Sequence, residues 1–273
     1  MKYFIDTEFL EGTQKGLFKE TRPTIDLISI GIIAEDGREY YAISKDFNLK
    51  EAWNRYDEKP NMNYKPNFGG GSDGHYNPQF IKEYWLRDNV LKPIYLELLE
   101  KELGYGYSRH EFYTSTAFKM IGSDYKQFKY LIKKYGKTNK QISEEIIEFC
   151  TVNESRGNGI LEQVEGFKDT LNRTIEFYGY YSDYDWVAFC WLFGKMIDLP
   201  KVFPKYCIDL KQDYEILNNR CKRLHYEAQK NDKVKSNAVD LKDFTDYPKQ
   251  TSEHNALSDA RWNKQLYEFL QKI

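Results

Sequence analysis

The N-terminal segment Phe4-Ile5-Asp6-Thr7-Glu8-Phe9 places two carboxylates inside an apolar run. The segment favours a β-strand, in which side chains alternate between faces, so Asp6 and Glu8 should lie on one face. The flanking apolar residues indicate a central strand buried on both faces; a half-exposed strand with surface carboxylates is the alternative. Two like charges in a buried strand repel each other and lose hydration. Divalent cations offset this cost, because hard cations take oxygen ligands.

Strand and helix patterns along the chain predict a mixed α/β sheet. A first strand is expected at 2–9, followed by a hairpin made of a strand at 25–34, an Asp-Gly turn at 35–38 and a strand at 39–44. Two more strands are expected at 174–181 and 206–210. Helices are expected at 78–89, 141–150, 184–196, from about 210, and at 255–270. The polar stretches 56–78 and 222–249 predict loops.

Length and composition fit one large intracellular domain. The 273 residues suit a single domain over 1–273, with the Tyr- and Lys-rich stretch at about 100–140 as an insertion. The four cysteines form no C-x-x-C pair, which favours reduced thiols and a cytoplasmic location. No apolar run approaches the roughly 20 residues of a membrane span, and no leader segment is expected. The net charge is −2, so any nucleic-acid binding must depend on local patches.

A third carboxylate is expected where the strand at 174–181 leads into the next helix. Such strand ends are where α/β sheets place ligand groups. Asp183 and Asp185 both lie there. Ser182 or Asp183 can cap the helix by accepting a backbone N–H bond, which favours Asp185 in the first turn as the metal ligand.

A fourth carboxylate, Asp259, follows a titratable imidazole by five residues. Asn255 is a plausible N-cap, so His254 should lie in the preceding loop and be able to reach a substrate. Ala256 and Asp259 are three apart and share one helix face, where a small alanine lets the helix approach closely. An exposed loop histidine with no role is the alternative for His254. Together with the other acids, this segment suggests two-metal phosphodiester chemistry with a histidine base.

The order of these motifs resembles that of the DEDDh 3′–5′ exonucleases of the RNase H-like superfamily. In the tyrosine branch of that superfamily a Tyr precedes the last acid by four residues, but Asn255 stands there, which favours the histidine branch. Further segments are similar to the RNase AS family, a group of bacterial exoribonucleases selective for adenylate-rich RNA 3′ ends. They are Ile28-Ser29-Ile30-Gly31, Gly37-Arg38-Glu39-Tyr40-Tyr41-Ala42, Tyr178-Gly179-x-Tyr181-x-x-Tyr184-Asp185-Trp186 and His254-x-Ala256-Leu257-x-Asp259-Ala260-Arg261-Trp262. The likeness covers roughly 1–98 and 141–273.

The resemblance implies an RNase H-like α/β fold with a mixed five-stranded sheet flanked by helices. It also implies a 3′–5′ exoribonuclease that releases nucleoside 5′-monophosphates from RNA 3′ ends, single-stranded or in an overhang. Two Mg²⁺ or Mn²⁺ ions would be held by Asp6, Glu8, Asp185 and Asp259, with His254 as general base.

Phe9 and Leu10 would line the terminal ribose, because residues after the first motif's Glu usually do so in these enzymes. Related enzymes often pair, so a homodimer is also expected. An exodeoxyribonuclease of the same fold and a non-catalytic RNA-binding module are the alternative functions.

Overall fold

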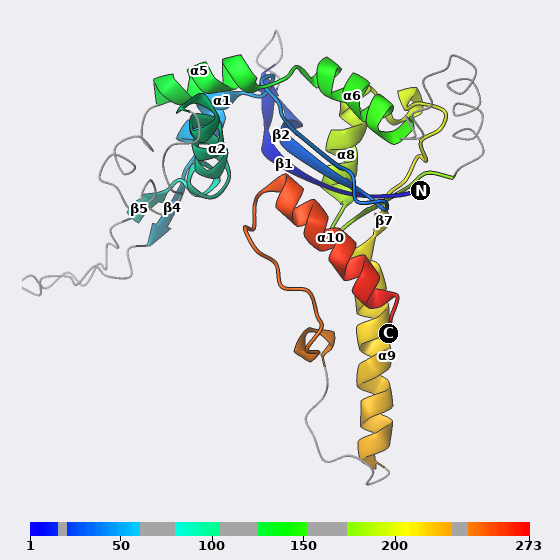
Figure 1. The fold of residues 1–273 in the computed structure, drawn as a ribbon. Helices are drawn as coiled ribbons and strands as arrows, with labels where there is room; N and C mark the ends of the chain where they lie inside the picture. Colours follow the sequence, from blue (N-terminus) through cyan, green and yellow to red (C-terminus); the bar gives the residue numbers. More distant parts are fainter. Residues whose placement is uncertain (16–20, 61–79, 104–124, 152–173, 231–239) are drawn as a thin grey trace, which may run out of the picture. The chain divides into compact units, whose positions relative to one another are not determined.

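The computed structural model describes residues 1–15, 21–60, 80–103, 125–151, 174–230 and 240–273 (Figure 1). They divide into two compact units. The sheet unit comprises Met1–Phe47 and Tyr135–Ile273, and the second unit comprises Asn48–Lys134. The insertion expected at about 100–140 overlaps the C-terminal part of the second unit, which begins much earlier in the chain.

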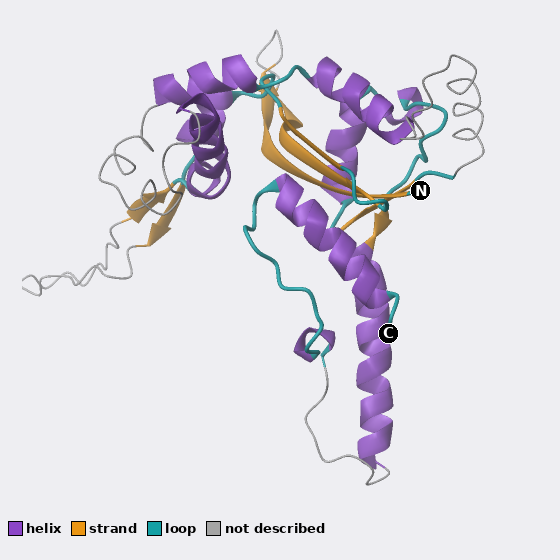
Figure 2. Ribbon diagram, in the orientation of Figure 1, coloured by secondary structure: helices purple, strands orange, loops and turns teal. Residues whose placement is uncertain are grey.

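The sheet unit is built on a mixed five-stranded sheet with strand order β3-β2-β1-β6-β7. β1, β2 and β3 pair antiparallel, whereas β6 and β7 run parallel to β1 (Figure 2). Its strands are β1 (Lys2–Lys15), β2 (Thr21–Ala34), β3 (Glu39–Ile43), β6 (Glu176–Gly179) and β7 (Ile208–Asp209). The α/β class and the mixed five-stranded sheet are therefore confirmed.

The hairpin of β1 and β2 is longer than the sequence predicts. Pairing continues from Glu11 opposite Ile25 to Lys15 opposite Thr21, and the register shifts between Glu8 and Phe9. Residues 11–15 are polar and show no apolar alternation, so their sequence does not indicate a strand. Their backbone is ordered by the ladder of hydrogen bonds with β2.

Helices cover both faces of this sheet, as Figure 1 shows. α6 (Asn139–Thr151) and α8 (Asp183–Leu192) pack on one face, and α9 (Leu210–Lys230) and α10 (Ala256–Leu270) pack on the other. The side chains of β1 alternate accordingly: Tyr3 and Ile5 join the α6–α8 core, and Phe4 joins the α9–α10 core. Two short 3₁₀ helices complete this unit, η2 (Met196–Asp198) and η3 (Leu241–Asp243).

Three of the expected helices need correction. Phe80–Glu83 is not helical but forms strand β5, because it pairs antiparallel with β4 (Asp57–Pro60). The loop expected at 56–78 is wrong over β4, and 61–79 lies outside the described residues. α8 ends four residues before the expected end, near Gly194, whose φ of 107° is not helical. α9 extends to Lys230, through the first part of the expected loop at 222–249, since residues 222–230 contain no Gly or Pro.

The second unit has its own small core. Trp53 and Tyr95 both pack against Phe128, with ring centroids 5.4 and 5.3 Å away. Its elements are α1 (Leu49–Asn54), β4, β5, a π-helical turn η1 (Arg87–Leu91), α2 (Lys92–Leu103) and most of α5 (Tyr125–Tyr135). Across the described parts of both units, a helix with the length and apolar character of a membrane span is not found.

Candidate active site

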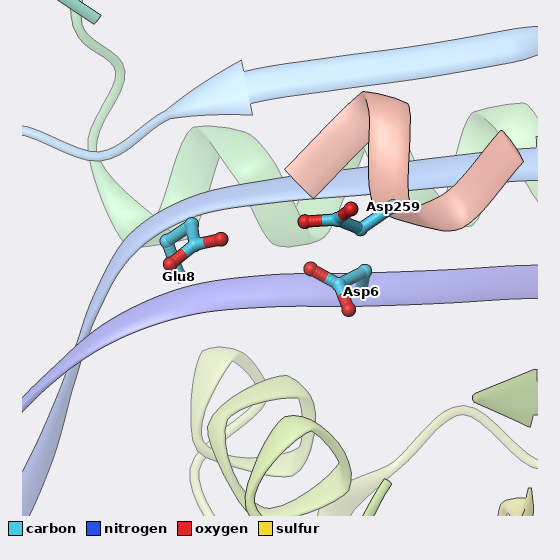
Figure 3. A group of neighbouring side chains, drawn as sticks. All are labelled: Asp6, Glu8 and Asp259. Atoms are coloured by element: carbon cyan, nitrogen blue, oxygen red, sulfur yellow. The ribbon is translucent and has the colours of Figure 1, made fainter. Parts of the chain in front are cut away.

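Three carboxylates from β1 and α10 meet on one face of the sheet. One ligand oxygen from each of Asp6, Glu8 and Asp259 lies within 4.8 Å of the other two. Figure 3 shows Asp6 and Glu8 rising from β1 toward Asp259 on the first turns of α10. The alternation predicted for β1 accounts for the shared face of Asp6 and Glu8. The approach of Asp259 depends on packing between segments some 250 positions apart in the numbering.

The close approach of α10 depends on a glycine in the sheet. A Cβ at Gly31 would lie 2.3 Å from the carbonyl oxygen of Ala256, closer than real Cβ contacts. Gly31 is the cross-strand partner of Asp6, so the helix meets the sheet beside this acid. Asn263 is buried and donates a 2.8 Å hydrogen bond to the carbonyl of Ile5, which fixes the helix along β1.

The loop before α10 is bonded to Asp259 at both carboxylate oxygens. The Gln250 side-chain amide donates to Oδ1 at 2.6 Å, and the His254 backbone N–H donates to Oδ2 at 2.9 Å. His254 adopts a φ of 66°, a left-handed conformation that is uncommon outside glycine. Asn255 caps the helix as expected, because its side chain accepts from the Ser258 N–H at 3.0 Å. His254 therefore lies immediately before the helix, with its backbone tied to a member of the acid cluster.

The fourth acid, Asp185, contacts β1 from the α8 side. It is buried, and its Oδ1 accepts hydrogen bonds from the backbone N–H and the hydroxyl of Thr7, at 2.8 and 2.6 Å. Asp183 is exposed on the same first turn. Ser182 occupies the N-cap position but forms no side-chain capping bond, so the expected capping bond is absent there. Of the two aspartates, Asp185 is therefore the one that contacts β1, the strand that carries Asp6 and Glu8.

Burial raises the pKa of all four carboxyls, and repulsion from the other acids adds to this for Asp6 and Glu8. Burial, then the charges of Asp185, Glu8 and Asp259, raise the pKa of Asp6 well above its usual range. Burial and the charges of Asp259 and Asp185 raise the pKa of Glu8 to about 8. For Asp185 burial raises the pKa to about 6, although the hydrogen bonds from Thr7 oppose the shift. Burial also raises the pKa of Asp259, and the bonds from Gln250 and His254 oppose it only in part.

The donor set fits divalent cations. Among the described residues, no Lys or Arg forms an ion pair with any of these four carboxylates. The hydroxyl of Ser29, which lies opposite Glu8 across the β1–β2 pair, is buried and has no hydrogen-bond partner within the described chain. Hard cations with their water ligands match such a set, since they supply positive charge and polar partners together.

Phe9 and Leu10 follow the cluster on β1 but differ in access. Phe9 is half-buried and packs edge-on against the Tyr184 ring, with centroids 5.7 Å apart. Leu10 is 1% exposed. A side chain so deeply buried offers no surface to a nucleotide, whereas Phe9 keeps part of its surface accessible; a substrate contact at Phe9 stays a prediction.

The sequence did not indicate three residues that shape the site. Thr7 and Gln250 bind Asp185 and Asp259 directly, and Gly31 permits the helix contact. Gly31 falls within a segment already noted for its family likeness, but nothing in its immediate neighbours shows what packs on it. Alternation along the strand places Thr7 on the face opposite Asp6 and Glu8, and nothing in the sequence indicates that it binds Asp185. For Gln250 the chain offers no signal, because a glutamine after a lysine in a polar loop is ordinary.

Comparison with known proteins gives a short but strong match. No family model matches the chain. Two curated relatives, 3′-5′ exoribonucleases from two strains of Mycobacterium tuberculosis, are each 52% identical over 52 residues. The matched stretch is 19% of this chain and 26% of each relative, so the chain spans about a quarter of the length of the relatives it matches.

Proposed function

We propose that this chain is a metal-dependent 3′–5′ exoribonuclease of the RNase H-like superfamily, histidine branch, which releases nucleoside 5′-monophosphates from RNA 3′ ends. The observation that carries the proposal is the cluster of half-buried Asp6 and Glu8 with buried Asp259, together with Asp185, which contacts the same strand. The names of the two relatives support the same activity. The family likeness further supports RNase AS membership and a preference for adenylate ends.

Each acid has a defined part in this proposal. Asp6, Glu8, Asp185 and Asp259 would hold two Mg²⁺ or Mn²⁺ ions. When bound, such ions supply Lewis-acid stabilisation of the charge that develops on the attacking and leaving oxygens. The chain's own contribution is a fixed, partly dehydrated set of oxygens, in which Thr7 orients Asp185 and Gln250 orients Asp259.

His254 would accept the proton of the attacking water on its imidazole. An imidazole suits this role because its ordinary pKa lies near neutrality. The bond from its backbone N–H to Asp259 keeps it beside the acid cluster without making it a ligand. Phe9, next to Glu8 on β1, would pack against the terminal nucleotide.

The alternatives make different predictions about products. An exodeoxyribonuclease would degrade a matched DNA at least as fast as RNA. A binding module would release no mononucleotide, and it would have no need for four acids whose mutual repulsion destabilises the fold.

The test is a product assay on 5′-labelled RNA and DNA of matched sequence, single-stranded and with 3′ overhangs. We expect stepwise shortening of RNA from the 3′ end with Mn²⁺ or Mg²⁺, none with EDTA, and a loss of at least about 100-fold in Asp6→Asn. Mononucleotides should appear from the first turnover. Intact RNA under all metal conditions would reject the proposed function.

Substrate preference is measured in the same assay. RNA should be degraded faster than DNA, because the 2′-hydroxyl is what distinguishes them at a given site. Poly(A) should be degraded faster than poly(C) or poly(U). Equal rates on the three homopolymers would remove the adenylate preference alone, and equal rates on DNA would remove the RNA preference.

A further inference from the structure

A pocket lies on the α8 side of the sheet, between the extended β1–β2 hairpin and α8. Its volume is about 380 Å³, within the usual range for small-molecule sites. Two successive cross-strand pairs, Glu11 with Ile25 and Gly12 with Thr24, form the strand side of the pocket. Two aromatic residues of α8, Tyr184 and Trp191, form the helix side.

The position of the pocket relates it to the candidate active site. Glu11 is three residues beyond Glu8 on β1, about 10 Å along the strand, and this odd step places it on the opposite face, the one that contacts α8 and Asp185. Tyr184 directly precedes Asp185 in the first turn of α8. An RNA strand whose 3′ end lies at Asp185 can therefore reach the pocket with a nearby upstream nucleotide.

The aromatic pair is presented to solvent rather than to the core. Tyr184 is 53% exposed and Trp191 is 47% exposed, although both belong to a helix that is otherwise largely apolar. They are seven residues apart, about two helical turns, and so lie on one face. Phe9 packs edge-on against the Tyr184 ring and limits its movement. Large rings held at a pocket wall with free faces are suited to stacking.

The charge of the pocket selects a base over a phosphate. Of the described residues that line it, Glu11 is the only charged one. A carboxylate repels phosphate, whereas aromatic rings stack on any nucleobase at about 1–3 kcal/mol per base. The Glu11 carboxylate can accept a hydrogen bond from the edge of such a base, as can the Thr24 hydroxyl oxygen, whose proton is donated to Asp26.

We infer that the pocket lined by Tyr184 and Trp191 is a stacking subsite for a nucleobase upstream of the scissile phosphate. The inference rests on the proposed exoribonuclease function. In this inference Trp191 binds the RNA strand and takes no part in the chemical step. The extension of the β1–β2 hairpin beyond the acids forms one wall of the subsite.

The test measures RNA affinity separately from catalysis. In an Asp6→Asn background, fluorescence anisotropy gives the Kd of a labelled oligoribonucleotide for Trp191→Ala and Trp191→Phe. Tyr226→Ala is the matched control, since Tyr226 is 67% exposed on α9, outside the pocket. We expect Trp191→Ala to weaken binding by about 5- to 150-fold, as loss of one stacked base does. Trp191→Phe should restore most of the affinity, and the control should change it less than twofold, as expected for a residue that does not touch RNA.

A second arm locates the base. The same proteins are titrated with RNAs that carry one abasic nucleotide at successive positions from the 3′ end. At one upstream position, the missing base should weaken binding to the Asp6→Asn protein that keeps Trp191. The same RNA should bind the Trp191→Ala protein no more weakly, because the two changes remove the same contact. Thermal unfolding of Trp191→Ala checks that the fold is retained.

The outcomes separate this inference from the proposed function. If the unmodified protein degrades RNA but Trp191→Ala, folded, binds as tightly as its parent, the subsite is rejected and the exoribonuclease stands. The subsite is also rejected if, at every abasic position, the loss of affinity caused by Trp191→Ala adds to the loss caused by the missing base. If the unmodified protein neither binds nor degrades RNA, the proposed function fails, and the subsite fails with it.

Discussion

Replacing Glu8 by Gln should stabilise the metal-free protein while abolishing activity. The Glu8 carboxylate lies within 4.8 Å of oxygens of Asp6 and Asp259, and neutralising it removes both the cost of burying a charge and the repulsion from the other acids. Glutamine keeps the size of the side chain, so packing changes little. A catalytic acid cluster predicts this opposition between stability and activity; an ordinary surface carboxylate predicts neither effect.

The magnitude follows from the pKa of Glu8, which is raised from 4.5 to about 8. Ionisation is harder in the folded state, so wild-type stability falls as pH rises through this window and is level above it. The Gln variant has no such dependence. Its advantage should thus be near zero at pH 4.5 and grow by at most about 1.4 kcal/mol per pH unit toward pH 8. One pair of charges 4.8 Å apart contributes about 3 kcal/mol at an effective dielectric constant of about 20, which agrees in size.

Thermal unfolding in EDTA between pH 5 and 9 measures this effect. We expect Glu8→Gln to melt about 5 °C above wild type at pH 8, with little difference at pH 5. Glu253→Gln, which alters an exposed carboxylate of the neighbouring loop, should melt like wild type at every pH. Adding Mn²⁺ should raise the wild-type Tm by mass action and the Glu8→Gln Tm by less. A variant less stable than wild type at pH 8 in EDTA would refute the argument from repulsion.

Three further substitutions test the geometry. Gly31→Ala should displace the start of α10, because its Cβ would lie 2.3 Å from the Ala256 carbonyl oxygen; calorimetry should show a loss of about 1–3 kcal/mol and weaker Mn²⁺ binding. Asp185→Asn should reduce turnover by at least about 100-fold while Asp183→Asn stays near wild type, and the reverse pattern in single-turnover assays would contradict the choice between them. His254→Ala should reduce turnover by about 10²–10⁴-fold with Tm and Mn²⁺ affinity nearly unchanged, and should alter the acidic limb of the pH–rate profile; a folded variant with normal turnover would exclude a general base.

Local patterns were sufficient to predict most of the sheet. The alternation around Asp6 and the Asp-Gly turn at 35–38 placed β1, β2 and β3 within a few residues at most boundaries. The capping residue Asn255 likewise marked the start of α10. Each of these features is decided by residues within one element, and the sequence shows them directly.

The misassigned elements depended on distant partners. Phe80–Glu83 has a plausible helical pattern, but pairing with β4 decides its conformation. Residues 222–230 are polar enough for a loop, yet they continue α9, and Lys222 forms an ion pair with Asp240 of the returning chain. In both cases tertiary contacts outweigh weak local preferences.

The acid cluster depends on the contact between β1 and α10. Successive turns of α10 meet β1 in order: the Tyr267 ring packs on Phe4 at 5.3 Å, Asn263 bonds to the carbonyl of Ile5, and Asp259 lies by Asp6 and Glu8. From Tyr267 to Asp259 the helix advances about 12 Å, and from Phe4 to Glu8 the strand advances about 13 Å, so the two elements stay in contact over this length.

On this face both elements change from apolar to acidic at the same level. The α9–α10 core includes Phe4 of β1 and Leu266 and Ala260 of α10, and the carboxylates of Asp6 and Asp259 follow at its edge. The apolar half holds the helix in place, and Gly31 lets it lie close to the sheet. Apolar packing at the other end of β1 and α10 therefore offsets the repulsion among the acids. For this reason the acids can remain together before any cation is bound.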